Sequence, residues 1–64
     1  MIKEGDKVKL HTDEIAIISE VLENDVAYIA EVFLKKGGIS IEQISQKDII
    51  SVFEEIEHPI PISI

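Results

Sequence analysis

Between residues 7 and 34 the chain contains three short segments that turn-forming residues separate. In the first segment, residues 7–11, Val8 and Leu10 fall on one side and Lys7 and Lys9 on the other. Alternation with a period of two is typical of a β-strand that buries one face. This half of the chain is therefore predicted to form strands joined by tight turns.

The composition favours the same class of fold. The 64 residues include fourteen isoleucines and five valines, but only one tyrosine and two phenylalanines. Branching at Cβ restricts the χ1 angle and suits the half-buried surface of a sheet. A chain of this length buries only about 60% of its unfolded surface, which is enough for one small core. We therefore expect a single all-β domain over residues 1–57.

The second segment, residues 14–22, is almost continuously apolar. Neither set of alternating side chains is polar enough to identify the solvent side of a strand. A β-bulge adds one residue to a strand and switches its register, which would reconcile such a segment with a sheet. We therefore predict a bulge within residues 14–22.

The third segment, residues 26–34, follows Glu-Asn-Asp at 23–25, where residues tolerate the left-handed backbone of a tight hairpin. Glu31 is expected to face water. Period-two alternation then places Tyr28, Ala30 and Val32 in the core and leaves Ile29 and Phe33 pointing outward. Two large apolar side chains on the outside of a strand are the unusual feature of this segment.

The remaining strands are shorter. Lys-Lys-Gly-Gly at 35–38 predicts a second hairpin turn, and residues 39–44 a fourth strand. Residues 45–48 are expected to form a single 3₁₀ turn before a fifth strand at 49–53. An amphipathic helix over residues 45–57 is the alternative, because apolar residues there also approach helical spacing. Two prolines exclude a helix from residues 58–64, which are expected to be an extended or flexible tail.

This order of elements resembles the five-stranded SH3-like barrel of small uncharacterised bacterial proteins. In such proteins a phrase like KEGDKVKL at 3–10 opens the barrel, one like AYIAEV at 27–32 forms the central strand, and one like QKDI at 46–49 precedes the last strand. The resemblance implies a fold rather than an activity. The more distant KOW-type barrels share the opening and often contact RNA or ribosomal proteins, but the loops of this chain are acidic where those proteins are basic.

The formal net charge is −7, from 13 acids and six lysines, with no arginine. Binding to phosphate backbones depends on lysine and arginine, and arginine is the preferred reader of base edges. A field of one sign favours basic partners and deters acidic ones such as nucleic acid and anionic membranes. No apolar run approaches the roughly 20 residues of a membrane span, and no signal peptide is recognisable. We expect a cytoplasmic, soluble protein that binds neither nucleic acid nor membrane.

Residue types that carry catalysis or bind metals are few. The chain has no cysteine, and its two histidines, His11 and His58, would need carboxylates such as Asp13 or Glu57 close by to form a site. No serine lies in a nucleophile motif, and no lysine with serine or threonine follows the two glycines at 37–38, so these glycines are interpreted as a turn rather than a phosphate loop. We therefore predict that the protein is not an enzyme and has no metal or cofactor.

The hypothesis that remains is a protein-interaction module that binds a protein partner or a second copy of itself. The candidate surface is an apolar outer patch with an acidic rim, formed by Ile29, Phe33, Leu22, Ile18 and Glu31. Residues 58–64 bear on this choice, since their isoleucines alternate as in a strand and would either cover the patch or extend a neighbour's sheet. The alternatives are an acidic inhibitor that mimics nucleic acid and a KOW-like binder of RNA or ribosomes.

Overall fold

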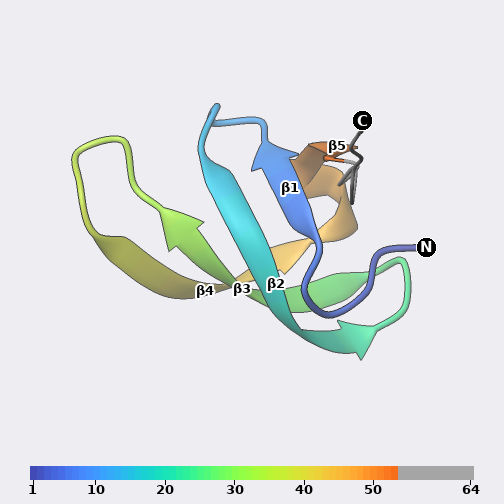
Figure 1. Ribbon diagram of the computed structural model, residues 1–64. Coiled ribbons are helices and arrows are strands. Elements are labelled where there is room, and N and C mark those ends of the chain that lie inside the picture. The colour runs from blue at the N-terminus through green and yellow to red at the C-terminus, as the bar shows by residue number, and fades with distance from the viewer. Residues whose placement is uncertain (54–64) are drawn as a thin grey trace, which may run out of the picture.

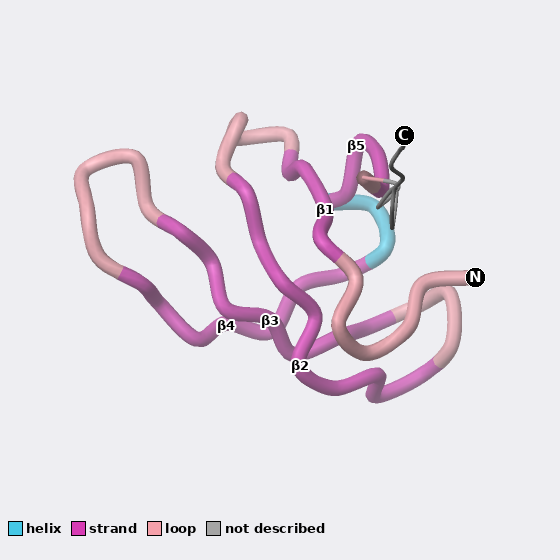
Figure 2. Tube along the Cα trace, viewed as in Figure 1, coloured by secondary structure: helices cyan, strands magenta, loops and turns pink. Residues whose placement is uncertain are grey.

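In a computed structural model the chain folds into an all-β domain, and the structure describes residues 1–53. Five strands and one 3₁₀ turn follow one another along the chain (Figure 1, Figure 2). Their bounds are β1 Lys7–Leu10, β2 Ile15–Glu23, β3 Ala27–Phe33, β4 Ile39–Ser45, η1 Gln46–Asp48 and β5 Ile49–Val52. These are the elements that the sequence predicts, with ends that differ by at most one residue.

All five strands belong to one antiparallel sheet in the order β4-β3-β2-β1-β5. The sheet curls strongly, so that β5 turns back over one side of the sheet (Figure 1). The all-β prediction is confirmed, but the barrel is open: within residues 1–53 no ladder joins β4 to β5, and these two strands are the edges. The 3₁₀ turn between them provides the only connection that the chain itself makes across this opening in the described residues.

The core lies on the concave face of the sheet. It consists of Ile2, Val8, Leu10, Ala16, Ile18, Tyr28, Ala30, Val32 and Ile44. Tyr28, Ala30 and Val32 alternate along β3 as predicted, and each is at most 1% exposed. No polar or charged side chain is buried within residues 1–53. The core is therefore made of apolar side chains from one face of each strand, as expected when period-two alternation determines burial.

Ile2 is a core residue that strand periodicity does not identify, because it precedes the first strand. Residues 5 and 6 bring it there by continuing the pairing of β1 with β2. The amide of Ile18 donates to the carbonyl oxygen of Asp6 over 2.9 Å, and the amide of Gly5 donates to the carbonyl oxygen of Ile18 over 2.8 Å. The N-terminus is thus held across the end of β2, and Ile2 is only 6% exposed.

A bulge interrupts the pairing of β2 with β3. Ile18 pairs with Ala30 and lies in the core, but the next paired residue of β2 is Glu20, opposite Ile29. Ser19 therefore has no partner in the ladder, and its hydroxyl donates to the carbonyl oxygen of Ile29 over 3.1 Å. The predicted bulge is confirmed. Because the register shifts at the bulge, the set of alternating side chains that faces the core changes along β2. This change explains why the strand is almost continuously apolar.

The turns have the backbone conformations that their residues favour. Asp13 and Asp25 adopt positive φ angles of 77° and 64°, in the left-handed region that aspartate tolerates better than most residues. Gly37, with φ of 105°, and Gly38, with φ of 91°, occupy the β3–β4 turn. Within residues 1–53 no helix has the length and apolar character that crossing a membrane requires.

The segment after β4 is the 3₁₀ turn of the main prediction rather than the alternative helix. Asp48 stabilises this turn, since its Oδ2 accepts hydrogen bonds from the amide of Ser45 over 2.9 Å and from the hydroxyl of Ser45 over 3.2 Å. Residues 49–52 then pair with β1 as a strand. The helical alternative is wrong for residues 45–53, and the rest of it, like the predicted tail at 58–64, lies outside the described residues.

Candidate functional site

The convex side of the sheet carries an unusually apolar set of side chains, here named the outer face. Strand register aligns its members in two rows: Ile15, Phe33 and Ile39 lie opposite one another across β2, β3 and β4, and Ile17, Glu31 and Ile41 form the next row. Ile29 follows on β3. Directly opposite residues of antiparallel strands point to the same side, so six apolar side chains lie around the carboxylate of Glu31. The polar residues Glu20 and Gln43, both opposite Ile29, lie at the end of the face.

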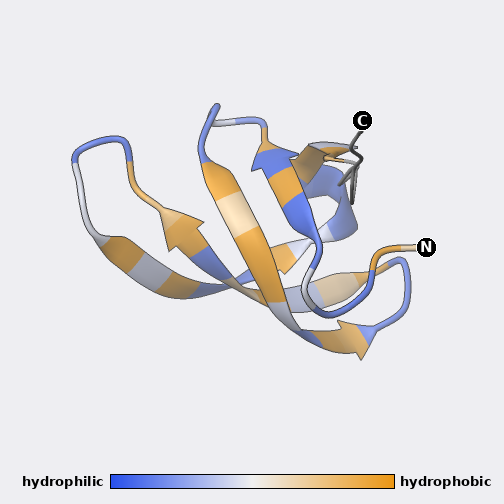
Figure 3. Ribbon diagram, viewed as in Figure 1, coloured by the Kyte–Doolittle hydropathy of each residue, from blue (hydrophilic) through white to orange (hydrophobic). Residues whose placement is uncertain are grey.

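These side chains are accessible to different degrees. Ile41 is 70% exposed, Ile39 58% and Phe33 37%, whereas Ile15, Ile17 and Ile29 are half-buried by their neighbours. Figure 3 shows apolar positions on β2, β3 and β4 in orange, interrupted by paler and bluer polar positions. Exposure therefore increases from the middle of the sheet toward its β4 edge.

Glu31 lies in the middle of the outer face. Its neighbours on β3 are Ile29 and Phe33, and its partners on the adjoining strands are Ile17 and Ile41. Within residues 1–53 no cationic group lies within ion-pairing distance of its carboxylate. The outer face thus combines a large apolar area with one central negative charge that has no intramolecular ion-pair partner in the described part of the chain.

The border of the outer face is charged. On β1, Lys7 pairs with Ile17 and Lys9 with Ile15. Both ammonium groups already have contacts: that of Lys9 lies 3.6 Å from the carboxylate of Asp13, and that of Lys7 lies 5.7 Å from the centre of the Phe53 ring. Lysines therefore mark the β1 border of the face.

Only some of the five residues of the predicted patch lie on the outer face. Ile29, Phe33 and Glu31 lie together on the outer face as expected. Ile18 does not, because it lies before the bulge, points into the core and is 1% exposed. Leu22 is 46% exposed but sits at a second register shift, between Val21 and Glu23, and has no partner on β3. The corrected patch therefore excludes Ile18 and has Leu22 only at its margin.

Sequence reasoning missed four members of the outer face. The sequence does not assign Ile15 and Ile17 to a side of the sheet, because without the position of the bulge the two faces of β2 are equivalent. Residues 39–44 are predicted to form a strand, but the side of the sheet on which Ile39 and Ile41 lie depends on the β3–β4 register. The signal that would have found them is their place opposite Phe33 and Glu31, which follows once the turn at Gly37 is positioned.

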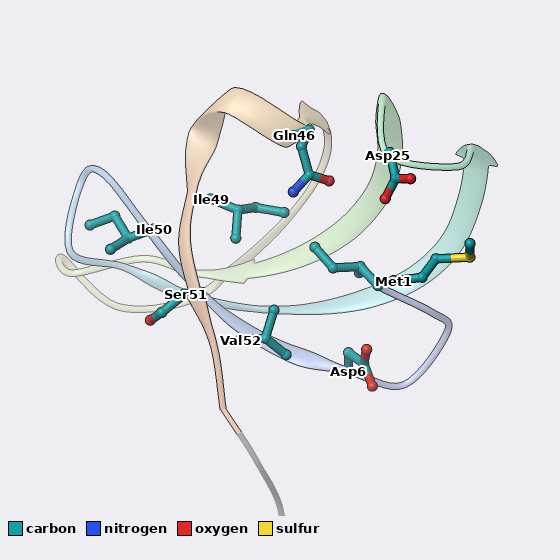
Figure 4. A pocket seen from close by; sticks show the side chains of 9 residues that line it. Met1, Asp6, Asp25, Gln46, Ile49, Ile50, Ser51 and Val52 are labelled. Atoms are coloured by element: carbon teal, nitrogen blue, oxygen red, sulfur yellow. The ribbon is translucent and has the colours of Figure 1, made fainter.

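The structure also has a cleft of about 450 Å³ at the N-terminal end of the barrel, between residues 1–6, the β2–β3 turn and β5. Figure 4 shows the side chains of Met1, Asp6, Asp25 and Gln46 around it. Two of the polar groups have structural partners: Asp6 accepts from the amide of Lys3 over 3.0 Å, and Oε1 of Gln46 accepts from the hydroxyl of Tyr28. With no histidine and one serine in its lining, this cleft presents no recognisable catalytic arrangement.

A smaller cleft of about 220 Å³ lies at the opposite end of the barrel and includes His11. Glu14, in the lining of this cleft, already has hydrogen-bond partners in the fold: its carboxylate accepts from the hydroxyl of Thr12 over 2.9 Å and from the amide of Lys35 over 3.2 Å. Within residues 1–53 no three histidine, aspartate or glutamate side chains are placed to hold a metal ion. His58 and Glu57 lie outside the described residues.

Comparison with models of known protein families, with curated protein sequences and with solved structures finds no match for this chain. The outer face, defined by geometry alone, is therefore the basis of the functional assignment.

Proposed function

We propose that the protein is a non-enzymatic interaction module that binds a protein partner through the outer face. The partner would present apolar side chains to the isoleucines and Phe33, and a basic side chain to Glu31. The observation that carries this proposal is the arrangement of six apolar side chains around one carboxylate on the convex side of a sheet whose concave side already holds a complete core.

Exposed apolar area supports the proposal on energetic grounds. Ile39 and Ile41 keep more than half of their surface in water, so they contribute less to folding than buried isoleucines do. A contiguous apolar surface rimmed by charge is typical of an interaction site rather than of a solvent-facing sheet. Burial of this surface against a partner would recover hydrophobic free energy that folding leaves unused.

Charge supports the choice of a basic partner. The chain has a formal net charge of −7, and this field accelerates encounter with positively charged surfaces. At contact, Glu31 would be desolvated among apolar neighbours, which is costly unless a cation pairs with it. Glu31 therefore acts as a selectivity element, because it penalises partners that offer only apolar or acidic groups at that point.

The two alternatives from the sequence are less well supported by this geometry. A nucleic-acid mimic requires a surface dominated by carboxylates, and an RNA-binding barrel requires exposed lysine, arginine or aromatic groups. The outer face has two carboxylates, Glu31 at its centre and Glu20 at its end, and one aromatic side chain among isoleucines. The interaction module is therefore the function we propose.

The test is affinity capture with four full-length proteins: the wild type, the double variant Ile29→Asp/Phe33→Asp, Glu31→Lys, and the control Val26→Asp. Val26 is an apolar residue of the β2–β3 turn that is 47% exposed and lies away from the outer face. Captured proteins are identified by mass spectrometry, purified and titrated against each variant. We expect the wild type and Val26→Asp to bind alike, and the double variant to bind at least about 30-fold more weakly, as for loss of an interface hot spot.

The charge reversal adds an independent criterion. Glu31→Lys should weaken the same partner, and the affinity of the wild type should fall with added salt. A partner that binds the double variant as well as the wild type, or that binds Glu31→Lys more tightly, would contradict the proposal. So would the failure of the wild type to bind any purified candidate.

A further inference from the structure

β4 is an edge of the sheet, and within residues 1–53 no strand pairs with its outer side. The hydrogen bonds that flank the β3–β4 ladder define which of its groups point outward. The amide of Leu34 donates to the carbonyl oxygen of Gly38 over 3.0 Å, and the amide of Gln46 donates to the carbonyl oxygen of Val26 over 2.9 Å. Gly38 and Gln46 are both even-numbered, and backbone groups alternate in direction along a strand. The even-numbered residues of β4 therefore direct their backbone groups to β3, and the odd-numbered residues direct theirs to the open edge.

Three residues of this edge, Ile39, Ile41 and Gln43, have backbone donors and acceptors that no group of residues 1–53 pairs with. The fourth odd-numbered residue, Ser45, is already occupied, since its amide donates to Asp48. The side chains of Ile39, Ile41 and Gln43 lie on the outer face, because they are opposite Phe33, Glu31 and Ile29. A strand that hydrogen-bonds to this edge would therefore be recognised by backbone groups and by an apolar row at the same positions.

The C-terminal sequence HPIPISI has the complementary pattern. Prolines at 59 and 61 have no amide hydrogen, whereas the isoleucines at 60, 62 and 64 each have one. In an extended strand the backbone groups of alternate residues point to opposite sides. One side of such a strand therefore has three isoleucine amides, and the other lacks two donors. Proline is confined in sheets to an edge strand with its nitrogen directed away from the neighbour.

We propose that residues 59–64 of a second copy of this chain add to the open edge of β4 as an antiparallel strand. Opposite Gln43, Ile41 and Ile39 would lie Ile60, Ile62 and Ile64, whose amides and carbonyls face β4. Antiparallel pairing puts directly opposite side chains on the same side of the sheet, so the added isoleucines continue the apolar rows of the outer face. The two prolines then face away from the ladder, where a missing donor costs nothing.

The antiparallel direction of the added strand follows from the same alternation of backbone groups along β4. In a parallel pair, a residue whose backbone groups face its neighbour bonds to the two residues that flank its opposite position. The three isoleucines would then lie opposite even-numbered residues of β4, beside Ser40 and Glu42 on the other side of the sheet. Antiparallel addition matches two of the three isoleucines with Ile41 and Ile39, whereas parallel addition places them on the side of Ser40 and Glu42.

A second copy is favoured over the same molecule by the path of the chain. β5 starts at the 3₁₀ turn, next to the end of β4, and Phe53 lies beyond the far end of β5. To begin opposite Gln43, residues 54–59 of the same molecule would have to return along β5. This connection contains three glutamates, at 54, 55 and 57, whereas the strand along which it would return exposes apolar side chains: Ile50 is 51% and Val52 43% exposed. Between two copies the acidic connection stays in water, and reciprocal exchange forms both ladders.

This inference is independent of the proposed function, since it uses the edge of β4 and not the binding of a heterologous partner. The sharpest test is a pair of full-length proline variants. Ile62→Pro removes an amide that faces β4, whereas Ser63→Pro removes one that faces away and preserves the alternation of proline with isoleucine. Light scattering over a wide range of concentration should show dimers for the wild type and for Ser63→Pro. Dissociation constants for Ile62→Pro should be at least about tenfold higher.

Amide hydrogen exchange of the full chain supplies a second measurement. The amides of Ile39, Ile41 and Gln43 should be protected, and their protection should decrease on dilution and in Ile62→Pro. Protection that does not change with concentration would indicate that the same molecule occupies the edge, and would overturn the proposal. Equal association of the two proline variants, or a monomeric wild type whose Ile41 amide exchanges freely, would overturn it as well. The double variant Ile29→Asp/Phe33→Asp separates this result from a failure of the proposed function, because it leaves the β4 edge intact.

Discussion

The hydroxyl of Tyr28 donates a hydrogen bond to Oε1 of Gln46, joining the middle of the core to the 3₁₀ turn. Tyr28 is fully buried, and Gln46 supplies the polar partner that its hydroxyl needs. The same glutamine donates its amide to the carbonyl oxygen of Val26 over 2.9 Å. The turn that leads from β4 to β5 is thus hydrogen-bonded both to β3, through Tyr28, and to the residue that precedes β3, Val26.

Removing this hydroxyl should destabilise the protein. We expect Tyr28→Phe to lower the free energy of unfolding by about 0.5–1.5 kcal/mol, since a typical intramolecular hydrogen bond contributes about that much. Urea denaturation measures the change. A double-mutant cycle with Gln46→Ala should give a coupling energy of about 1 kcal/mol, and additive effects of the two substitutions would show that the pair does not interact.

Acid should weaken the fold through Asp6. The amide of Lys3 donates to its carboxylate over 3.0 Å and is the main reason that the pKa of Asp6 is lowered, helped by the nearby ammonium group of Lys3. A carboxyl with a lower pKa in the folded state stabilises the fold above its unfolded pKa, and this contribution is lost as the pH falls through the folded pKa. The wild type should therefore be more stable than Asp6→Asn near neutral pH, and the difference should shrink below about pH 4.

Urea denaturation of the wild type and Asp6→Asn at several pH values measures this difference. The carbonyl oxygen of asparagine still accepts from the Lys3 amide, so the comparison isolates the charge. A difference that stays constant down to strongly acidic pH would show that Asp6 titrates normally.

Core and outer-face isoleucines should respond differently to truncation. Ile18 is 1% exposed, so Ile18→Ala should cost about 2–5 kcal/mol of stability by loss of burial and formation of a cavity. Ile41 is 70% exposed, so Ile41→Ala should cost no more than about 1 kcal/mol, mainly through lower β-propensity. Thermal or urea denaturation of dilute protein compares the two. Equal losses would mean that Ile41 is buried in solution.

The left-handed backbone at Asp25 predicts a strong dependence on residue type. With φ of 64°, a β-branched side chain is strained, and Asp25→Val should cost about 1–2 kcal/mol. Asp25→Gly should change the free energy of unfolding by less than about 1 kcal/mol, since relief of strain is offset by greater freedom of the unfolded chain. If valine is tolerated as well as glycine, the turn has a different conformation in solution.

Glu31 should be a residue at which stability and binding conflict. Glutamate has low β-propensity, so Glu31→Thr on this central strand should raise the free energy of unfolding by about 0.5 kcal/mol. The same substitution removes the carboxylate that we assign to a basic partner, and affinity for that partner should fall. Calorimetry of the unbound protein and a binding titration make the two measurements. A stabilised variant with full affinity would remove Glu31 from the site.

Much of the fold was predictable because local pattern and burial agree. Alternation along β3 placed Tyr28, Ala30 and Val32 in the core, and the residues of the turns matched the backbone angles they adopt. The bulge was predictable in kind, since a run with no polar side must switch register. Its position at Ser19 was not, because a bulge one residue earlier or later gives a similar pattern of apolar residues.

The amino-acid order alone determined that this is a small all-β chain with acidic loops and an outward-facing Ile29 and Phe33. Only the tertiary structure decided which isoleucines join them. Register and bulge position convert residues far apart in the chain into neighbours, and so they assigned Ile18 to the core and Ile17 and Ile41 to the two sides of Glu31. Side-chain alternation specifies that a strand has two faces, but cross-strand hydrogen bonds specify what lies beside each residue on them.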